Sequence, residues 1–119
     1  MGSVHVEIVV EHPGSSGKRE NCRVQADTGA TLTVLPKALL VAIGVMPEGQ
    51  REFMLADGRK MSRAVGEARV RINGDAVVTR VVFGESGDAS LLGVTALEEL
   101  GLMVDPVARR LIPTTYQMF

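Results

Sequence analysis

Apolar and polar residues alternate along much of this chain, which indicates extended segments with one buried face. The clearest run spans 4–10, where every second position is valine or isoleucine and His5 falls on the opposite, solvent-facing side. In the returning stretch at 18–26, Cys22, Val24 and Ala26 would share the inner face. Further stretches with strand character lie at 32–35, 53–56, 60–65, 68–72, 77–83, 102–105 and 109–112. The pattern therefore predicts a mainly β protein.

Turn residues separate these stretches. Asp57-Gly58 and Asn73-Gly74 each lie between extended segments, and both turn positions tolerate positive φ, so two hairpins are expected. A further turn is expected at 13–17, which is rich in glycine and serine. No linker, low-complexity tract or break in composition is visible, so residues 1–119 are expected to form one domain.

Two short helices complete the predicted elements. The first is expected at 36–43, because Pro36 suits the first turn of a helix and Gly44 suits the left-handed residue that ends one. Its residues Leu39, Leu40 and Ile43 are available for packing. The second is expected after Leu91-Leu92-Gly93, where Thr95 and Glu98 fit a capping box and Gly101 fits the stop.

Composition narrows the class of protein. The chain has 119 residues, of which 45% are hydrophobic and only 3% aromatic, so its core must be built mostly from aliphatic side chains. Its 13 basic and 14 acidic residues form no long basic run, so neither nucleic acid nor an anionic membrane is expected as a partner. No apolar stretch is long enough to span a membrane, and the N-terminus lacks the layout of a signal peptide.

The single cysteine and the two histidines exclude several kinds of site. Cys22 cannot form an internal disulfide, which favours a reducing compartment, and a cytoplasmic location is expected. Its position on an apolar face predicts a buried, inert thiol and not a nucleophile. His5 and His12 with one cysteine give no metal-ligand spacing, so no metal site is expected.

Asp27-Thr28-Gly29 is the strongest candidate for chemistry. The tripeptide alone is also compatible with an ordinary turn. However, an apolar strand precedes it and 30–36 follows as another, so the carboxylate would lie between two buried strands. Burying a lone carboxylate costs several kcal/mol unless it is compensated, so an acid in that place needs a functional reason.

The order of motifs resembles that of the retropepsin-like (clan AA) aspartic proteases over nearly the whole chain. Asp27-Thr28-Gly29-Ala30, the helix that begins at Pro36, the hairpin at Asp57-Gly58 and Leu91-Leu92-Gly93 carry the likeness. The stretch 92–106, with 110–113, is similar to microbial single-domain members and to the protease-like domain of eukaryotic ubiquitin-shuttle proteins. The resemblance implies a closed β-barrel with two short helices, an aspartic endopeptidase activity, and a homodimer, since the chain holds one such loop and the dyad needs two.

The resemblance also assigns roles within the loop. Asp27 would face its counterpart from the second subunit and share one proton with it, one carboxylate acting as base toward water and the other as acid toward the scissile carbonyl. Thr28 would hydrogen-bond across the dimer. Gly29 would permit the tight turn, and its N–H would orient the carboxylate. Ala30 would keep the floor narrow beside the substrate. No metal and no organic cofactor are implied.

The hairpin around Asp57-Gly58 would be the flap that closes over an extended peptide. Its charged tip, 56–60, departs from the glycine-rich, apolar tip of viral members and suggests a more open, solvated cleft. Asp57 is interpreted as a turn former and not as a second catalytic acid. The residues expected to contact substrate, from their positions alone, are Ala30, Met54, Ala56, Asp57, Gly58, Val82 and Leu91.

Two questions stay open at the level of the sequence. The segment 114–119 could pair between subunits as a strand, or it could be a frayed terminus. The same scaffold could also serve as a non-cleaving peptide- or partner-binding module, or as a dimerisation module, because a fold does not fix a function.

Overall fold

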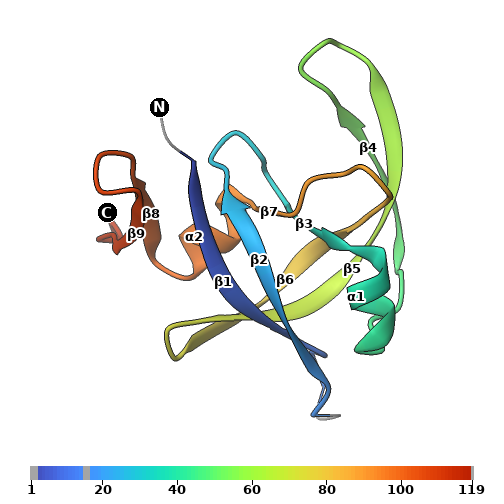
Figure 1. The fold of residues 1–119 in the computed structure, drawn as a ribbon, viewed down its shortest axis with the longest axis horizontal. Coiled ribbons are helices and arrows are strands. Elements are labelled where there is room, and N and C mark those ends of the chain that lie inside the picture. The colour runs from blue at the N-terminus through green and yellow to red at the C-terminus, as the bar shows by residue number, and fades with distance from the viewer. Residues whose placement is uncertain (1–2, 15–16, 119) are drawn as a thin grey trace.

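Strands and two short helices make up the part of the chain that the computed structural model describes, residues 3–14 and 17–118 (Figure 1). In chain order the elements are β1 (Val4–Glu11), β2 (Arg19–Ala26), β3 (Thr33–Pro36), α1 (Lys37–Ala42), β4 (Gly49–Met54), β5 (Lys60–Ile72), β6 (Asp75–Gly84), β7 (Leu91–Leu92), α2 (Val94–Glu99), β8 (Leu102–Asp105) and β9 (Arg110–Pro113). The prediction of a mainly β protein with two short helices is confirmed. No helix within the described ranges is long and apolar enough to cross a membrane.

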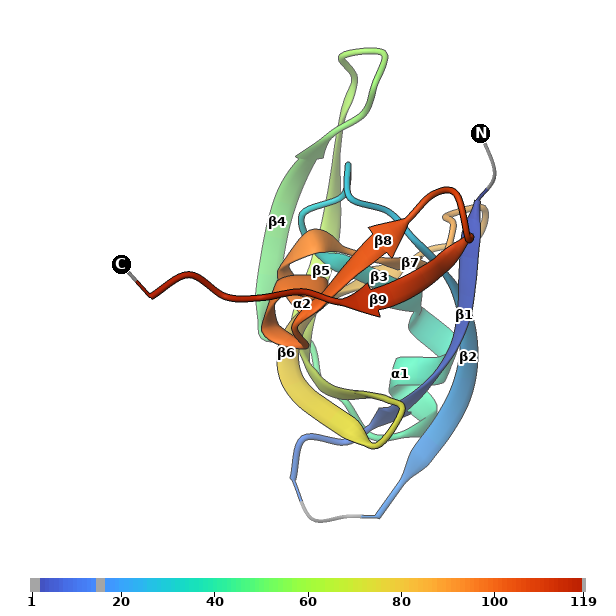
Figure 2. The same cartoon turned by 90° about the vertical axis from the view of Figure 1, so that its left-hand side faces the viewer.

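The main sheet has seven strands in the order β1-β2-β7-β3-β6-β5-β4. Strand β1 also pairs with β5 over Val9–Glu11, so the strand pairings return on themselves and form a ring. Strands β8 and β9 form a separate hairpin, which packs beside α2 in both views (Figures 1 and 2). The short strand β7 lies between β2 and β3, which brings the segment at residue 91 next to the loop that follows β2.

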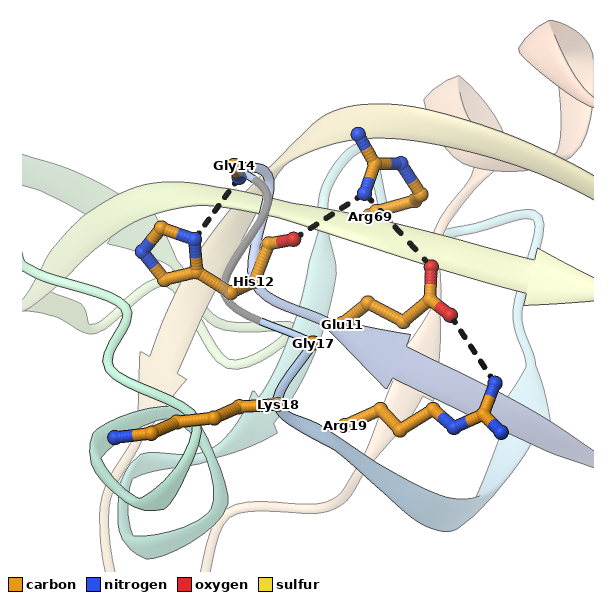
Figure 3. A pocket seen from close by; sticks show the side chains of 7 residues that line it. All are labelled: Glu11, His12, Gly14, Gly17, Lys18, Arg19 and Arg69. Carbon is orange, nitrogen blue, oxygen red and sulfur yellow. Dashed lines mark hydrogen bonds and ion pairs between the residues drawn. The ribbon is translucent and has the colours of Figure 1, made fainter.

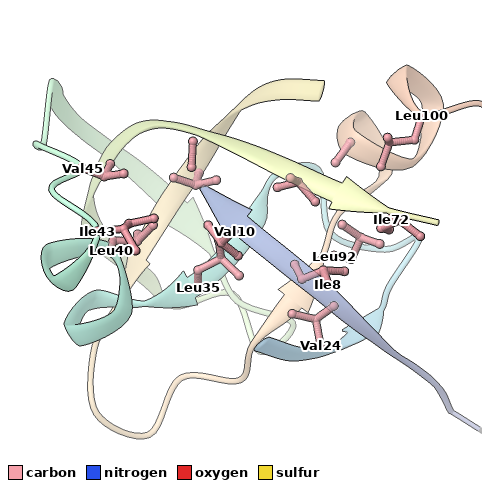
Figure 4. Packing of buried hydrophobic residues seen from close by; sticks show 14 of the residues in the cluster. Ile8, Val10, Val24, Leu35, Leu40, Ile43, Val45, Ile72, Leu92 and Leu100 are labelled. Carbon is pink, nitrogen blue, oxygen red and sulfur yellow. The ribbon is translucent and has the colours of Figure 1, made fainter. Parts of the chain in front are cut away.

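One cluster of buried side chains, all aliphatic except Phe83, fills the space enclosed by the sheet and the two helices (Figure 4). Strand β1 contributes Ile8 and Val10, which are fully buried, while His5 is exposed, as the alternation predicted. Val24 and Ala26 of β2 are also buried, and Cys22 is partly buried against the same cluster. The inward faces of β1 and β2 therefore follow from their period-two patterns.

Both predicted hairpins form, but with different turns. Asn73 (φ 51°) and Gly74 (φ 85°) are both left-handed, as expected for a two-residue turn. At the other hairpin only Gly58 has a positive φ (89°), because the loop holds an extra residue. The N–H of Gly58 donates to the carbonyl of Leu55, and the N–H of Leu55 donates to the carbonyl of Arg59. The predicted hairpin therefore forms with a longer loop than a two-residue turn, in which a tight turn is followed by a left-handed glycine.

The predicted strands 60–65 and 68–72 are one continuous strand, β5. Gly66, which lies between them, does not interrupt it. A Cβ at Gly66 would lie 2.8 Å from the carbonyl oxygen of Met46 and 3.1 Å from the Phe83 ring, so glycine serves there to let other groups approach the strand closely.

The helices begin and end near the predicted positions. Pro36 immediately precedes α1, and Gly44 (φ 83°) follows its end in the left-handed conformation. Gly101 (φ 69°) ends α2 in the same way. The predicted capping box is not formed: Gly93 is the residue that precedes α2, and no side chain caps its N-terminus. The first N–H groups of α2 are instead satisfied by the loop described in the next section.

Glu11 on β1 forms ion pairs with three arginines of the neighbouring strands, of which Figure 3 shows those with Arg19 and Arg69. The carboxylate of Glu11, whose side chain is 13% exposed, lies 3.2 Å from Arg71 Nη2, 3.7 Å from Arg19 Nη1 and 3.9 Å from Arg69 Nη1. The hydrogen bond from Arg71, together with the positive charges, holds the pKa of Glu11 below its ordinary value. The predicted turn at 13–17 includes residues 15 and 16, which lie outside the described part of the chain.

Replacing Glu11 with glutamine should destabilise the protein by about 1–3 kcal/mol near neutral pH, since three arginines lose their shared partner. Because the folded-state pKa of Glu11 is depressed, its contribution is present above the unfolded-state pKa and is lost as the pH falls through the folded value. The difference in Tm between the two proteins should therefore shrink below about pH 4.3. Glu7→Gln, an exposed glutamate on the same strand, is the control. A Tm difference that stays constant down to about pH 3 would contradict this assignment.

Candidate active site

Asp27 lies directly after β2, at the start of a tight surface loop. Its backbone N–H donates to the carbonyl of Leu92 at 3.0 Å, and its carbonyl accepts from the N–H of Ala30 at 3.1 Å. Its carboxylate oxygen Oδ1 accepts from the N–H of Gly29 at 2.8 Å, which is the hydrogen bond expected for this loop. Asp27 is half-buried and Thr28 is exposed, so within a single chain the acid faces the surface and is not enclosed between strands.

Glycine at position 29 has a different role from the one predicted. Its φ is not in the left-handed region, so the turn itself does not demand glycine. A Cβ at this position would lie 3.2 Å from Oδ1 of Asp27, closer than side chains normally approach. Glycine therefore leaves room for the carboxylate to receive the backbone N–H directly.

The segment between β7 and α2 supports the Asp27 loop through backbone hydrogen bonds. The N–H groups of Val94 and Thr95 donate to the carbonyls of Ala30 and Thr31 at 2.8 and 3.1 Å. These are the first N–H groups of α2, so the loop replaces the side-chain cap that the helix lacks. A Cβ at Gly93 would lie 2.5 Å from the backbone of Leu32, so the two segments are in direct backbone contact.

Thr33 connects the same two segments from inside the core. It is only 1% exposed, and its Oγ1 accepts from the N–H of Gly93 at 3.0 Å. Thr33 was not among the residues predicted to belong to the site. The signal was available, because a threonine on the inward face of an otherwise aliphatic strand needs a hydrogen-bond partner.

Changing Thr33 to valine keeps the shape of the side chain but leaves the N–H of Gly93 buried without an acceptor. The expected loss of stability is about 1–3 kcal/mol, measured by urea unfolding. Thr33→Ser keeps the hydroxyl, so its loss of stability should be much smaller than that of the valine variant. Equal losses for the valine and serine variants would show that the hydroxyl does not hold the two segments together.

Two neighbouring pockets lie beside the β4–β5 hairpin, and the first of them lies between the hairpin and this loop. The first, of about 400 Å³, is lined by residues 29–32 of the loop, Val34, and residues 52–56 of the hairpin. The second, of about 210 Å³, is lined by Val34, Phe53, Leu55, Met61, Arg63, Val82, Asp88, Ala89 and Leu91. Since Val34, Phe53 and Leu55 line both, the two pockets belong to one cleft.

The candidate substrate contacts are distributed unevenly over this cleft. Ala30, Met54 and Ala56 line the first pocket, and Val82 and Leu91 line the second. Asp57 and Gly58 stand at the hairpin tip and line neither pocket. Phe53 and Leu55, which line both pockets, were missed, although alternation along 53–56 places them on the same face.

The Asp57 carboxylate forms hydrogen bonds within its own turn. Its carboxylate accepts from the N–H of Arg59 at 3.0 Å and from Arg59 Nε at 2.6 Å. These two hydrogen bonds, the backbone one first, lower the pKa of Asp57. This geometry supports the interpretation of Asp57 as a turn former.

Other chemistry finds little support in the structure. Burial raises the pKa of the Cys22 thiol, which disfavours the reactive thiolate. Among residues 3–14 and 17–118, no group of three or more histidine, cysteine, aspartate or glutamate side chains is placed to hold a metal ion.

Solved structures of viral proteases share this fold. A structure titled EIAV protease complexed with the inhibitor HBY-793 matches with a TM-score of 0.65 and 18% identity, covering 87% of this chain and 93% of that one. The solution structure of the simian foamy virus (mac) protease matches with a TM-score of 0.52 and 21% identity, covering 80% and 94%. The foamy viral protease-reverse transcriptase in complex with an RNA/DNA hybrid matches with a TM-score of 0.55 and 20% identity, covering 87% of this chain but 14% of that one.

Comparison of sequences gives the family. No curated protein matches the chain. The family described as gag-polyprotein putative aspartyl protease matches residues 16–99, which include the Asp27 loop, the β4–β5 hairpin and Leu91-Leu92-Gly93. Since this match spans well over half of the sequence, the chain belongs to the gag-polyprotein putative aspartyl protease family and has the retropepsin-like fold.

Proposed function

We propose that this protein is an aspartic endopeptidase whose dyad is formed by Asp27 from each of two identical subunits. The observation that carries the proposal is the loop itself: a surface carboxylate is held by the N–H of Gly29 at 2.8 Å on a backbone braced from below. The sequence contains a single Asp-Thr-Gly, so one chain supplies one of the two acids. A two-fold dimer places the same surface of both chains face to face.

In such a dyad, two neighbouring carboxylates share one proton. The ionised Asp27 takes a proton from water while the water oxygen attacks the scissile carbonyl carbon, and the protonated Asp27 gives its proton to the carbonyl oxygen. The tetrahedral intermediate then collapses. One of its hydroxyl protons returns to a carboxylate, the C–N bond breaks, and the other carboxyl group protonates the departing nitrogen. The dyad ends as it began, with one proton.

The surface beside Thr28 supports docking of a second copy. A hollow of about 570 Å³ opens there. Its apolar lining residues are Val94, Leu97, Leu102, Met103, Val104 and Pro106, and its polar ones are Thr28, Glu98 and Thr114. Met103, on β8, is 46% exposed, and Met118 near the C-terminus is 84% exposed. Covering such a surface with its own copy removes apolar area from water and brings the two Asp27 loops together.

The cleft is suited to an extended peptide. Within the described ranges β4 pairs with β5 alone, so its other edge offers free backbone groups to a peptide strand. The two pockets below it would receive side chains of that peptide. Thr114–Phe119 remains a candidate for pairing between subunits; Phe119 itself lies outside the described residues.

The dimer makes the proposal testable by dilution. Specific activity on a peptide substrate should fall as the protein is diluted through the dissociation constant found by sedimentation. Met103→Glu should raise that constant by about tenfold or more, because it puts a charge into the apolar contact. Val78→Glu is the control, because Val78 is an apolar residue of β6 that is 40% exposed and does not line the hollow. Full activity in a strictly monomeric protein would contradict the proposed dyad.

A further inference from the structure

A two-point ion pair joins the β4–β5 hairpin to the loop between β6 and β7. Arg63 on β5 donates from Nε to Asp88 Oδ2 at 2.7 Å and from Nη2 to Asp88 Oδ1 at 3.0 Å. The two side chains are 18% and 23% exposed, unlike the other pairs of the hairpin, which lie in solvent. Parallel hydrogen bonds of this kind fix geometry as well as charge.

Asp88 is held in place by its own loop as well. Its Oδ2 accepts from the N–H of Glu85 at 2.8 Å, and its own N–H donates to the carbonyl of Glu85 at 2.9 Å. The hydrogen bond from Arg63 lowers the pKa of Asp88, and Asp88 in turn raises the pKa of Arg63. Both groups therefore stay charged in mildly acidic solution, and the pair stays formed.

This pair forms part of the wall of the smaller pocket. The pocket's other lining residues are all apolar: Val34, Phe53, Leu55, Met61, Val82, Ala89 and Leu91. Its volume of about 210 Å³ is below the roughly 300–1,000 Å³ of a pocket for a small molecule, so it suits one side chain. Because the two charges of its wall neutralise each other, a charged side chain entering it would find no unpaired partner.

We propose that Arg63 and Asp88 determine the specificity of this pocket: as a neutral pair they close its wall, so that it takes one uncharged aliphatic side chain of the bound peptide. This inference rests on the proposed function, since it assumes that the cleft binds a peptide. Breaking the pair leaves one unpaired charge on an apolar wall. That charge would be compensated by a peptide side chain of opposite sign, so each half of the pair should select a different peptide.

The test measures binding and not cleavage. Fluorescent octapeptides, in which each position in turn is Leu, Glu or Lys among mixed residues, are titrated by anisotropy onto protein carrying Asp27→Asn. In this background, Asp88→Asn should improve binding of Glu relative to Leu at one position by about tenfold, the scale of one charge-assisted hydrogen bond. Arg63→Gln should do the same for Lys at the same position. Asparagine can still accept the N–H of Glu85, so the loop should keep its shape.

Arg51→Gln is the matched control, because Arg51 faces Arg63 in the register of the same hairpin but does not line the pocket. It should leave all preferences unchanged. Unchanged preferences in the Asp88 and Arg63 variants would overturn the inference, and so would a shift of equal size in Arg51→Gln or a failure of any peptide to bind. Cleavage by the wild-type protein is measured separately. The cleavage result tests the proposed endopeptidase activity, and the binding result tests the selectivity of the pocket.

Discussion

Asp27→Asn is expected to lower kcat/KM for peptide cleavage by at least about 10³-fold, because the amide can neither take a proton from water nor share one with its counterpart. The asparagine side chain has nearly the same size, and its oxygen can still accept the N–H of Gly29. The fold should therefore survive, with little change in Tm. The measurement is cleavage of a mixed peptide library by both proteins across acidic to neutral pH, because the two carboxyl groups of a dyad titrate as a pair.

Mixing the two proteins sharpens this test. If each site needs one Asp27 from each subunit, an inactive chain should inactivate the wild-type chain that it pairs with. At equal amounts of the two, activity per wild-type chain should fall to about half, since heterodimers form as readily as homodimers. Undiminished activity would contradict a shared dyad. A wild-type protein that cleaves nothing at any pH would favour the non-cleaving binding or dimerisation module.

Gly93→Ala should destabilise the protein by about 3 kcal/mol, the upper end of the usual cost of overpacking a core. In a domain of this size, that loss should lower the Tm by about 10 °C or more. The added Cβ would lie 2.5 Å from both the carbonyl carbon and oxygen of Leu32. These are backbone atoms, so no side chain can rotate away to make room. Relief requires the loop of Asp27 to separate from α2, which would also break the hydrogen bond from Gly93 to Thr33.

Gly49→Ala supplies the control for this substitution. At Gly49 the nearest atom to an added Cβ is the end of the Arg51 side chain at 3.9 Å, and φ is not left-handed. The expected change in Tm is small. If thermal unfolding shows equal losses at the two glycines, the close contact between the loop and α2 is not what holds the site.

Local signals in the sequence were sufficient for most elements of the fold. The alternation in 4–10 identified β1 and its buried face, because a strand covered on one side must alternate. Asn73-Gly74 located a hairpin, and Gly44 and Gly101 located two helix ends, because left-handed backbone favours these residues. The Asp27 loop was found from its motif and its resemblance to a family. That resemblance also implied the hydrogen bond from the N–H of Gly29 to the Asp27 carboxylate, which the structure contains.

Features that depend on contacts distant in sequence could not be derived in this way. The capping box predicted for α2 does not form, because the carbonyls of Ala30 and Thr31, from another part of the chain, accept hydrogen bonds from the first N–H groups of the helix. The sequence pattern predicted two strands, 60–65 and 68–72, yet Gly66 lies within one strand and makes room there for Met46 and Phe83.

The Asp27 loop shows the same division most clearly. By itself the sequence determined that one acid per chain sits in a tight loop after a buried strand, since that depends on neighbouring residues alone. Only the tertiary structure decided that Gly93 and Thr33 brace this loop and that Arg63 and Asp88 meet at the wall of the adjoining pocket. These pairs lie 60 and 25 residues apart in the chain, and no local pattern encodes which distant partner a buried polar group will find.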